Sequence, residues 1–214
     1  MRVLVIGANG DVGRRVIKKL KDTPHQAVAM IRDEAQKPDL QAHGAETVIA
    51  DLEGDISHAF ANNPEAVIFT AGSGGNTGQE KTRSVDLQGA KKSIDEAKKH
   101  GAKRYLMVSA LGAGQADEMP EEMKHYFVAK SEADQYLVQS NLNYTIFRPG
   151  RLTDENGAGS IQASENLENP DTRDITRDDL ATALVESIDM NHLVEKKVEI
   201  LEGKQPVRDA LQAV

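Results

Sequence analysis

The chain contains no cysteine and no tryptophan, and its 214 residues include only four tyrosines and four phenylalanines. The absence of cysteine excludes thiol catalysis, cysteine-ligated metals and disulfide bonds. There is also no run of lysine or arginine, and the net charge of −8 argues against a surface for nucleic acid or anionic membranes. The sequence therefore predicts neither a nucleic-acid partner nor a membrane partner.

Long hydrophobic runs are missing as well. The apolar stretch over residues 2–7 is too short for a signal peptide, and no cleavage site follows it. No stretch approaches the roughly 20 apolar residues of a transmembrane helix. With 39% apolar and 28% charged residues, the composition is that of an ordinary globular protein. We therefore expect a single domain over residues 1–214 and a cytoplasmic location.

What the chain does contain is a regular alternation of short apolar runs and longer helical patterns. The runs are nearly continuously apolar, as expected for parallel strands buried on both faces, and cover 2–7, 27–32, 45–50, 66–71, 104–110 and 144–150. Helical patterns fall between and after them, at 11–22, 34–42, 55–61, 79–100 and 122–140. This order predicts an α/β fold, a doubly wound parallel sheet with helices on both faces.

Two segments interrupt this alternation. Residues 111–121 are glycine-rich and then acidic, and residues 153–174 are polar with glycine and proline, so both are expected to be loops. Thr176 and Asp179 have the spacing of a helix capping box, and a strand over 197–201 and a closing helix over 205–213 follow. We predict that the two irregular segments form a small substrate lobe over the carboxyl ends of the strands.

Three glycines separate the first strand from the first helix. Gly7 would allow a tight turn, Gly10 would let the backbone approach a pyrophosphate, and Gly13 would permit close contact between helix and strand. Phosphates would then face free N–H groups at the helix N-terminus. The pattern predicts dinucleotide binding, and the alternative is a plain turn. The expected contacts are Gly7, Asn9, Gly10, Asp11, Val12 and Gly13.

The spacing of these glycines is GxxGxxG, and the stretch "RVLVIGANGDVG" resembles the short-chain dehydrogenase/reductase superfamily in its extended and atypical branches. The resemblance runs from Met1 to about residue 201. It implies a Rossmann fold that binds NAD or NADP, and an activity related to dehydrogenases, epimerases or dehydratases.

Arg32 ends the second expected strand, where a carboxylate would hold the ribose hydroxyls of NAD. A guanidinium can instead bind the 2′-phosphate of NADP, so NADP is the expected cofactor. Asp33 is the next residue, so NAD stays open. The alternative is a surface arginine paired with Asp33 or Glu34.

The resemblance also implies cofactor contacts after three later strands. Asp51 and Leu52 would lie near the adenine, and Thr70, Ala71 and Gly72 beside the cofactor ribose. In "RPG", residues 148–150, Pro149 and Gly150 would lie beside the nicotinamide. The alternative for this last segment is a plain strand exit held by proline.

Tyr126 and Lys130 are four residues apart, so on a helix they share one face. Such a pair arises easily by chance, so the motif alone is weak evidence. In the resembled family it follows a serine at the end of the fifth strand, here Ser109. The resemblance implies that Ser109 bonds the substrate oxygen and Tyr126 transfers the proton. Lys130 would bond the nicotinamide ribose and favour the ionised phenol by its charge.

Two features depart from the family pattern. The separation of 17 residues between Ser109 and Tyr126 is longer than usual, and Asp86 stands at the position of an active-site asparagine. Aspartate could accept the same hydrogen bonds but adds a charge that disfavours an ionised phenol. The alternatives are that Ser109 satisfies backbone groups at a strand end and that Tyr126 packs with Lys130 extending past it.

These observations predict an NADP-dependent oxidoreductase that moves a hydride between nicotinamide and a small carbonyl or alcohol substrate. Three alternatives stay open: a non-catalytic dinucleotide sensor, an NADPH-dependent flavin or quinone reductase, and a sugar-nucleotide epimerase or dehydratase. The region after residue 150 is short for a nucleotide-sugar site, which disfavours the last.

Some features give no further site. Six scattered histidines without HExxH-like spacing predict no metal site, and His125 is expected at the surface because it points away from Tyr126. Substrate specificity is expected to reside in 73–84, 111–121 and 153–174. The helices at 79–100 and 122–140 could pair in a homodimer.

Overall fold

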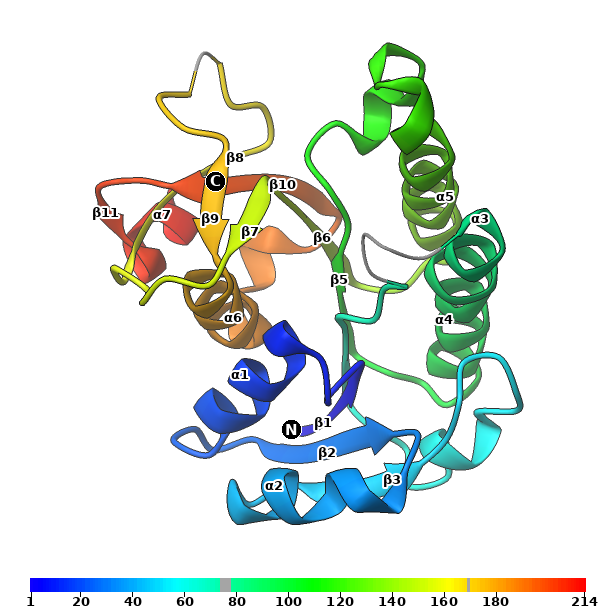
Figure 1. The fold of residues 1–214 in the computed structure, drawn as a ribbon. Coiled ribbons are helices and arrows are strands. Elements are labelled where there is room, and N and C mark those ends of the chain that lie inside the picture. Colours follow the sequence, from blue (N-terminus) through cyan, green and yellow to red (C-terminus); the bar gives the residue numbers. More distant parts are fainter. Residues whose placement is uncertain (74–77, 169) are drawn as a thin grey trace.

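A computed structural model describes residues 1–73, 78–168 and 170–214 of the chain. Residues 74–77 of the expected specificity segment 73–84, and residue 169 of the segment 153–174, lie outside this description. The fold is built on one large sheet whose seven parallel strands run in the order β3-β2-β1-β4-β5-β6-β10 (Figure 1). These strands are β1 (Arg2–Ile6), β2 (Gln26–Ile31), β3 (Glu46–Ile49), β4 (Ala66–Phe69), β5 (Arg104–Val108), β6 (Tyr144–Pro149) and β10 (Lys196–Glu202). The predicted doubly wound parallel sheet is confirmed.

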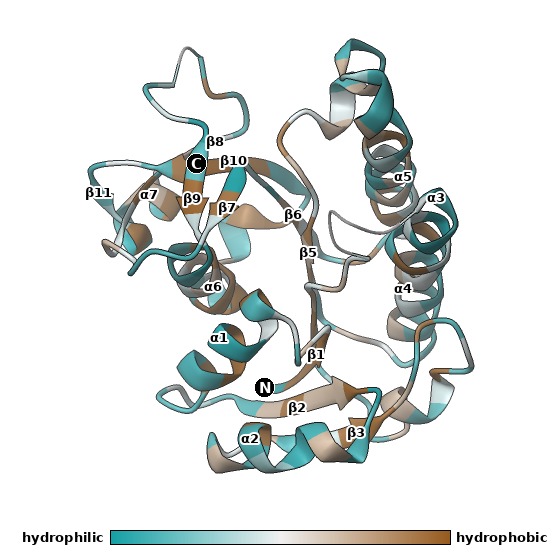
Figure 2. Ribbon diagram, in the orientation of Figure 1, coloured by the Kyte–Doolittle hydropathy of each residue, from teal (hydrophilic) through white to brown (hydrophobic). Residues whose placement is uncertain are grey.

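Alternate residues of the buried strands face opposite sides of the sheet, and each side has its own hydrophobic core. Val3 and Val5 of β1 belong to one core, while Leu4 and Ile6 belong to the other. In Figure 2 the strands in the middle of the sheet are coloured as hydrophobic, and the helices carry hydrophilic residues on their outer sides. This two-sided burial explains why the strands read as continuous apolar runs.

Helices cover both faces. The first core takes apolar residues from α1 (Asp11–Leu20), α2 (Lys37–Ala42), α6 (Arg177–Glu186) and α7 (Val207–Gln212). The second takes them from α4 (Ala90–Lys99), α5 (Glu121–Val138) and the 3₁₀ turn η2 (Ser57–Phe60). Three further short 3₁₀ turns are η1 (Glu34–Gln36), η5 (Ser187–Asp189) and η6 (Asn191–Leu193).

The expected loop at 153–174 is only partly irregular, which corrects the prediction. It contains β8 (Ser160–Ser164), which pairs antiparallel with β10 and with β11 (Gln205–Pro206). Two short parallel strands, β7 (Arg151–Thr153) and β9 (Asp174–Thr176), flank it. Within β8 only Ile161 is buried, so no apolar run marked this edge strand. Backbone pairing with β10, a long-range contact, makes it a strand.

The expected capping box is present where the lobe leads into α6. The Thr176 hydroxyl accepts a hydrogen bond from the backbone N–H of Asp179 at 3.0 Å and donates one to the Asp179 carboxylate at 2.9 Å. The Asp179 carboxylate also accepts hydrogen bonds from the backbone N–H groups of Ala158 and Gly159. These bonds tie the preceding loop to the helix. The capping prediction is confirmed.

Two other segments differ from their predictions. The expected loop at 111–121 contains a 3₁₀ helix, η4 (Ala113–Glu118), before α5 begins. The expected helix at 79–100 comprises α3 (Gln79–Lys81), a π-helical stretch η3 (Thr82–Gly89) and α4. A π-turn inserts an extra residue and often marks a functional position. Asp86 lies in this stretch.

Candidate active site

The glycine turn between β1 and α1 brings two backbone segments unusually close together. Gly7 has φ of +84°, and a Cβ there would lie 2.6 Å from the backbone nitrogen of Ala71, just after β4. Gly10 closes the turn by donating a hydrogen bond to the Gly7 carbonyl at 2.9 Å. A Cβ on Gly13 would overlap the Gly7 carbonyl oxygen. Each glycine therefore occupies a place where a side chain would displace backbone.

The N-terminus of α1 lacks a side-chain cap. Gly10 is its N-cap residue and has no side chain to accept a hydrogen bond from the first turn. The N–H groups of Asp11, Val12 and Gly13 thus form an electropositive helix end that an anion can approach. This geometry fits the pyrophosphate of a dinucleotide, because the glycines leave room beside it.

A cavity of about 410 Å³ lies beside this turn, over the ends of β1, β2, β3 and β4. Its lining includes nine of the expected cofactor residues: Gly7, Asn9, Gly10, Arg32, Asp51, Leu52, Thr70, Ala71 and Gly72. It also includes Gln36 and Lys81, which no sequence motif marked. The ends of β1 and β4 meet here because the strand order places them side by side.

The surroundings of Arg32 bear on the choice of cofactor. Asp33 uses its carboxylate to accept from the N–H of Ala35 at 2.9 Å, and Glu34 pairs with Lys37 at 2.7 Å. Within the described ranges no carboxylate lies within 4.0 Å of the Arg32 guanidinium. The expected alternative, a pairing of Arg32 with Asp33 or Glu34, is therefore not the arrangement seen.

A second cavity, of about 1030 Å³, continues from the first over the ends of β5 and β6. The two share the lining residues Gly10, Thr70, Ala71 and Gly72, so they form one cleft. The other expected site residues that line this second part are Asp11, Val12, Asp86, Ser109, Tyr126, Lys130, Pro149 and Gly150. Among the expected site residues, Gly13 alone lines neither part, because it packs against the turn.

Lys130 is buried at the base of the second cavity. Its Nζ lies 3.0 Å from an Asp86 carboxylate oxygen and 5.6 Å from the centre of the Tyr126 ring, and it reaches the Val108 carbonyl at 3.5 Å. Burial lowers the pKa of Lys130, but Tyr126 and Asp86 raise it more, so the net direction is upward. Lys130 therefore stays a cation beside Tyr126.

Asp86 connects three elements that meet at the cleft. One carboxylate oxygen faces Lys130 on α5, and the other accepts a hydrogen bond from the backbone N–H of Ser73 at 2.9 Å, after β4. A Cβ on Gly72 would lie 3.2 Å from the first oxygen. The aspartate side chain is fully buried, so its charge is balanced mainly by Lys130.

Ser109 and Arg148 lie on either side of Asp134, which sequence reasoning missed. The Ser109 hydroxyl is buried near the Asp134 carboxylate, but neither it nor the carboxylate oxygen Oδ1 has a well-formed hydrogen bond within the described residues. Arg148 donates to Oδ2 of Asp134 at 2.8 and 3.1 Å. Burial raises the pKa of Asp134 more than Ser109 and Arg148 lower it.

Asp134 did carry a signal in the sequence. It follows Lys130 by four residues and therefore shares its helix face. Because Arg148 pairs with Asp134, its side chain faces α5, whereas Pro149 and Gly150 line the cleft. His125, expected at the surface, is half-buried and also lines the cleft, because α5 presents its first two turns to the cavity.

No group of three His, Asp or Glu side chains in residues 1–73, 78–168 and 170–214 is arranged to hold a metal ion. None of the helices in the same ranges is both long and apolar enough to cross a membrane.

The fold and the cleft define a dinucleotide-binding Rossmann protein, and comparison with known proteins agrees. The family profile described as "NAD(P)H-binding" matches residues 7–191. The chain is 45% identical to the "Uncharacterized sugar epimerase YhfK" of Bacillus subtilis, over 99% of each chain. A solved structure from Bacillus halodurans, provisionally named an NAD-dependent epimerase/dehydratase, is 46% identical with a TM-score of 0.96 and full coverage of both chains.

A second solved structure, the oxidoreductase ylbE of Lactococcus lactis, is 29% identical with a TM-score of 0.86 and covers 100% of this chain and 96% of its own. The chain therefore belongs to the NAD(P)H-binding family. The resemblance to short-chain dehydrogenases/reductases stated from the glycine turn is confirmed, and the relatives are oxidoreductase-like or epimerase-like. A nicotinamide dinucleotide is thus the cofactor class.

Proposed function

We propose that the chain is an NADP-dependent oxidoreductase of the atypical short-chain dehydrogenase/reductase type, acting on a small carbonyl or alcohol substrate. The observation that carries the proposal is that Ser109, Tyr126 and Lys130 line one cavity with Pro149 and Gly150, next to the glycine turn. The bound cofactor would supply or accept a hydride at this place. The chain's own residues hold the substrate oxygen and move the proton.

Each side chain has a role that its surroundings support. In reduction, the neutral Tyr126 phenol donates its proton to the substrate oxygen, and Ser109 donates a hydrogen bond to that oxygen. The Lys130 ammonium has three N–H donors; it forms an ion pair with Asp86 and donates a long hydrogen bond, of 3.5 Å, to the Val108 carbonyl. It can therefore also donate to a ribose hydroxyl of the cofactor. Asp86 is a positioning residue, since it touches Lys130 rather than the reacting atoms.

The first experiment compares the wild type with Tyr126→Phe. NADPH oxidation is followed by absorbance with a panel of aldehydes and ketones, and NADPH affinity is measured separately. We expect kcat to fall by about 10²–10⁴-fold, the usual contribution of a positioned proton donor, with NADPH affinity unchanged. Lys130→Met serves as a companion variant that should lose affinity for NADPH as well as turnover.

The same experiment separates the other candidates. Turnover with a flavin or quinone that survives Tyr126→Phe would support the flavin or quinone reductase, because no proton transfer from Tyr126 is then needed. NADPH binding without oxidation by any member of the panel would support the non-catalytic sensor and contradict the oxidoreductase.

For the cofactor, we propose NADP rather than NAD, with Arg32 binding the 2′-phosphate. Support comes from the position of Arg32 in the first cavity, without a carboxylate partner in the described parts of the chain. Lys81 lines the same cavity and pairs with Glu53. Arg32→Ala should weaken NADPH binding by about 10–100-fold, the worth of one or two charge-assisted bonds, and leave NADH binding unchanged. Equal losses for both cofactors would contradict this role.

A second candidate is a sugar-nucleotide epimerase, which would use the same residues to oxidise and then re-reduce its substrate. It is favoured by the Bacillus subtilis relative, which is named a sugar epimerase and has almost the same length as this chain. Incubation with UDP-glucose and cofactor, followed by NMR of the sugar, tests it. Formation of the epimer without net cofactor consumption would favour this candidate over the first.

A small-molecule substrate, a cytoplasmic location and a homodimer belong to the same proposal. Sedimentation of the purified chain tests the dimer expected from the helices at 79–100 and 122–140. Cell fractionation tests the location.

A further inference from the structure

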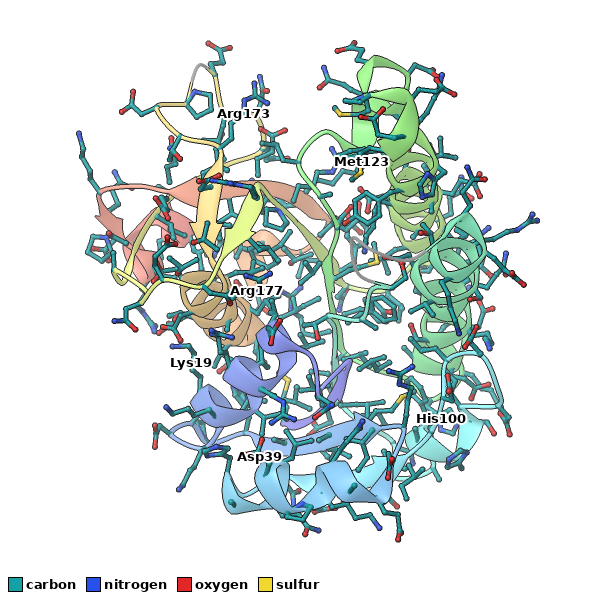
Figure 3. All side chains as sticks on the ribbon, in the orientation of Figure 1. Lys19, Asp39, His100, Met123, Arg173 and Arg177 are labelled. Carbon is teal, nitrogen blue, oxygen red and sulfur yellow. The ribbon has the colours of Figure 1, made fainter. Side chains whose placement is uncertain are left out.

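The outer end of the cleft carries groups that the proposed chemistry does not use. Arg173, just before β9, lines the second cavity from the lobe side, and Met123 lines it from α5. In Figure 3, Arg173 lies on the side of β9 and Met123 on the side of α5, and Arg177 lies nearer the middle of the molecule. Phe127 and Leu111 also line this cavity. The cleft thus has an apolar wall on the α5 side and is bordered on the lobe side by Arg173, an exposed arginine.

Backbone contacts fix the place of Arg173. Its carbonyl oxygen accepts a hydrogen bond from the N–H of Arg151 at 2.8 Å, within the pairing of β7 with β9. A Cβ on Gly150 would overlap that same oxygen. Gly150 follows Pro149 at the end of β6. The backbone of Arg173 therefore lies directly beside the segment expected to contact the nicotinamide.

Arg173 also differs from the other cations of the cavity. Each of those has a carboxylate partner: Lys130–Asp86 at 3.0 Å, Arg151–Asp174 at 2.6 Å and Arg177–Asp154 at 3.1 Å. In residues 1–73, 78–168 and 170–214, no carboxylate lies within 4.0 Å of Arg173. Among the arginines that line the two cavities, Arg32 of the first likewise lacks a carboxylate partner within the described residues. A planar guanidinium binds oxyanions well, often through two hydrogen bonds.

We propose that Arg173 binds the oxyanion of a substrate whose apolar body lies against Met123, Phe127 and Leu111. The substrate class is therefore an amphipathic carbonyl or alcohol compound that carries a carboxylate, sulfonate or phosphate. Glu122 lines the α5 side, so the substrate's anion belongs on the opposite side, with Arg173. The inference rests on the proposed function, since it names the substrate class of the same cleft.

The test uses two fluorescent dyes that differ by one charged group, with the protein saturated with NADP. 8-Anilino-1-naphthalenesulfonate carries a sulfonate, and N-phenyl-1-naphthylamine is its neutral counterpart. We expect the wild type to bind the sulfonate dye about tenfold more tightly than the neutral dye, as a single charge-assisted contact allows. Arg173→Gln should remove this preference and leave neutral-dye binding unchanged, while Arg173→Lys should retain part of it.

Two matched variants make the result specific. Arg208→Gln removes one positive charge at an ion pair with Glu186, away from the residues that line the cleft, and should leave the preference intact. Glu122→Gln should leave sulfonate-dye binding unchanged or strengthen it. The proposal is overturned if the wild type binds neither dye or shows no preference, if Arg173→Gln and Arg208→Gln behave alike, or if Glu122→Gln weakens sulfonate-dye binding.

Failure of the proposed function would look different. NADPH oxidation with small neutral aldehydes tests turnover without involving Arg173. Dye preference without turnover would leave the oxyanion site standing and remove the oxidoreductase. Turnover without dye preference would support the oxidoreductase and overturn the oxyanion site.

Discussion

The two parts of the cleft are built by different means. The part between β1, β2 and β4 is formed by backbone: glycines, strand ends and an uncapped helix N-terminus. The part between β5, β6 and α5 is formed by side chains, with buried ion pairs at Asp86–Lys130 and Asp134–Arg148. Backbone contacts depend on φ and on the space a Cβ would take. Ion pairs depend on both partners being present and desolvated together.

The two parts are therefore sensitive to different kinds of substitution. The folding of a backbone-built site tolerates changes of charge but fails when a glycine gains a side chain. A site built from buried ion pairs fails when one charge is removed, because the other is left without compensation. Substitutions of both kinds can therefore test the contrast.

The largest effect is expected from Asp86→Ala. It leaves the buried Lys130 ammonium without its carboxylate and should lower the free energy of unfolding by about 3–5 kcal/mol, the usual cost of breaking a buried pair. Denaturant unfolding measures this. Asp86→Asn removes the same charge but can still accept from the Ser73 N–H, so it should cost less than Asp86→Ala by about 1 kcal/mol, the worth of that hydrogen bond. Equal stability of Asp86→Ala and wild type would show that the pair contributes little.

A smaller effect is expected from Gly7→Ala in the backbone-built part. The new Cβ would strain a φ of +84° and lie 2.6 Å from the Ala71 nitrogen, so we expect a loss of about 2–3 kcal/mol and weaker NADPH binding. Gly44→Ala is the matched control: φ is +82°, but nothing in the described chain lies within 4 Å of the new Cβ. It should cost about 1 kcal/mol and leave NADPH binding unchanged. Similar NADPH losses in both would contradict the close-approach argument.

A pH dependence is expected in the side-chain part alone. The pKa of Asp134 is raised by burial, so the folded protein favours its protonated form more than the unfolded chain does. The stability from this group is thus present below its ordinary pKa and is lost as pH rises through the raised value. Asp134→Asn cannot titrate, so its destabilisation relative to wild type should shrink from pH 4 towards pH 7. Urea unfolding across this range measures it, and a destabilisation that grows with pH would contradict the assigned direction.

The smallest effect is expected from Arg151→Ala. This arginine is exposed and pairs with Asp174 at 2.6 Å in solvent, where water and salt screen the attraction. The melting temperature should not change within error at any salt concentration. A clear drop would show that ion pairs matter at the surface of the cleft as well as at its base.

Most residues that line the first part of the cleft could be predicted from the sequence. Gly7, Gly10 and Gly13 are close in the chain, and the strands that flank them are continuous apolar runs, so local pattern was sufficient. Tyr126 and Lys130 also share a helix face by spacing alone. The same spacing argument predicts that Asp134, four residues beyond Lys130, lies on that helix face as well.

The second part depends on contacts between distant segments. Arg173 reaches the cleft because β9 pairs with β7, and neither three-residue strand has a pattern of its own. The edge strand β8 forms by pairing with β10, and the π-helical stretch that contains Asp86 interrupts a segment whose sequence reads as an ordinary helix. Polar segments of this kind carry no period that would predict their partners.

The doubly wound sheet, the glycine turn and the shared helix face of Tyr126 and Lys130 could be predicted from the sequence, since each follows from residues a few positions apart. The folded structure was needed to show that Asp86 is buried against Lys130, that Arg148 faces Asp134 rather than the cleft, and that the backbone of Arg173 lies beside Gly150. A charged side chain pairs with a group that the fold brings within a few ångströms of it, and that group can come from a distant part of the sequence. Burial then raises the energetic cost of losing either partner.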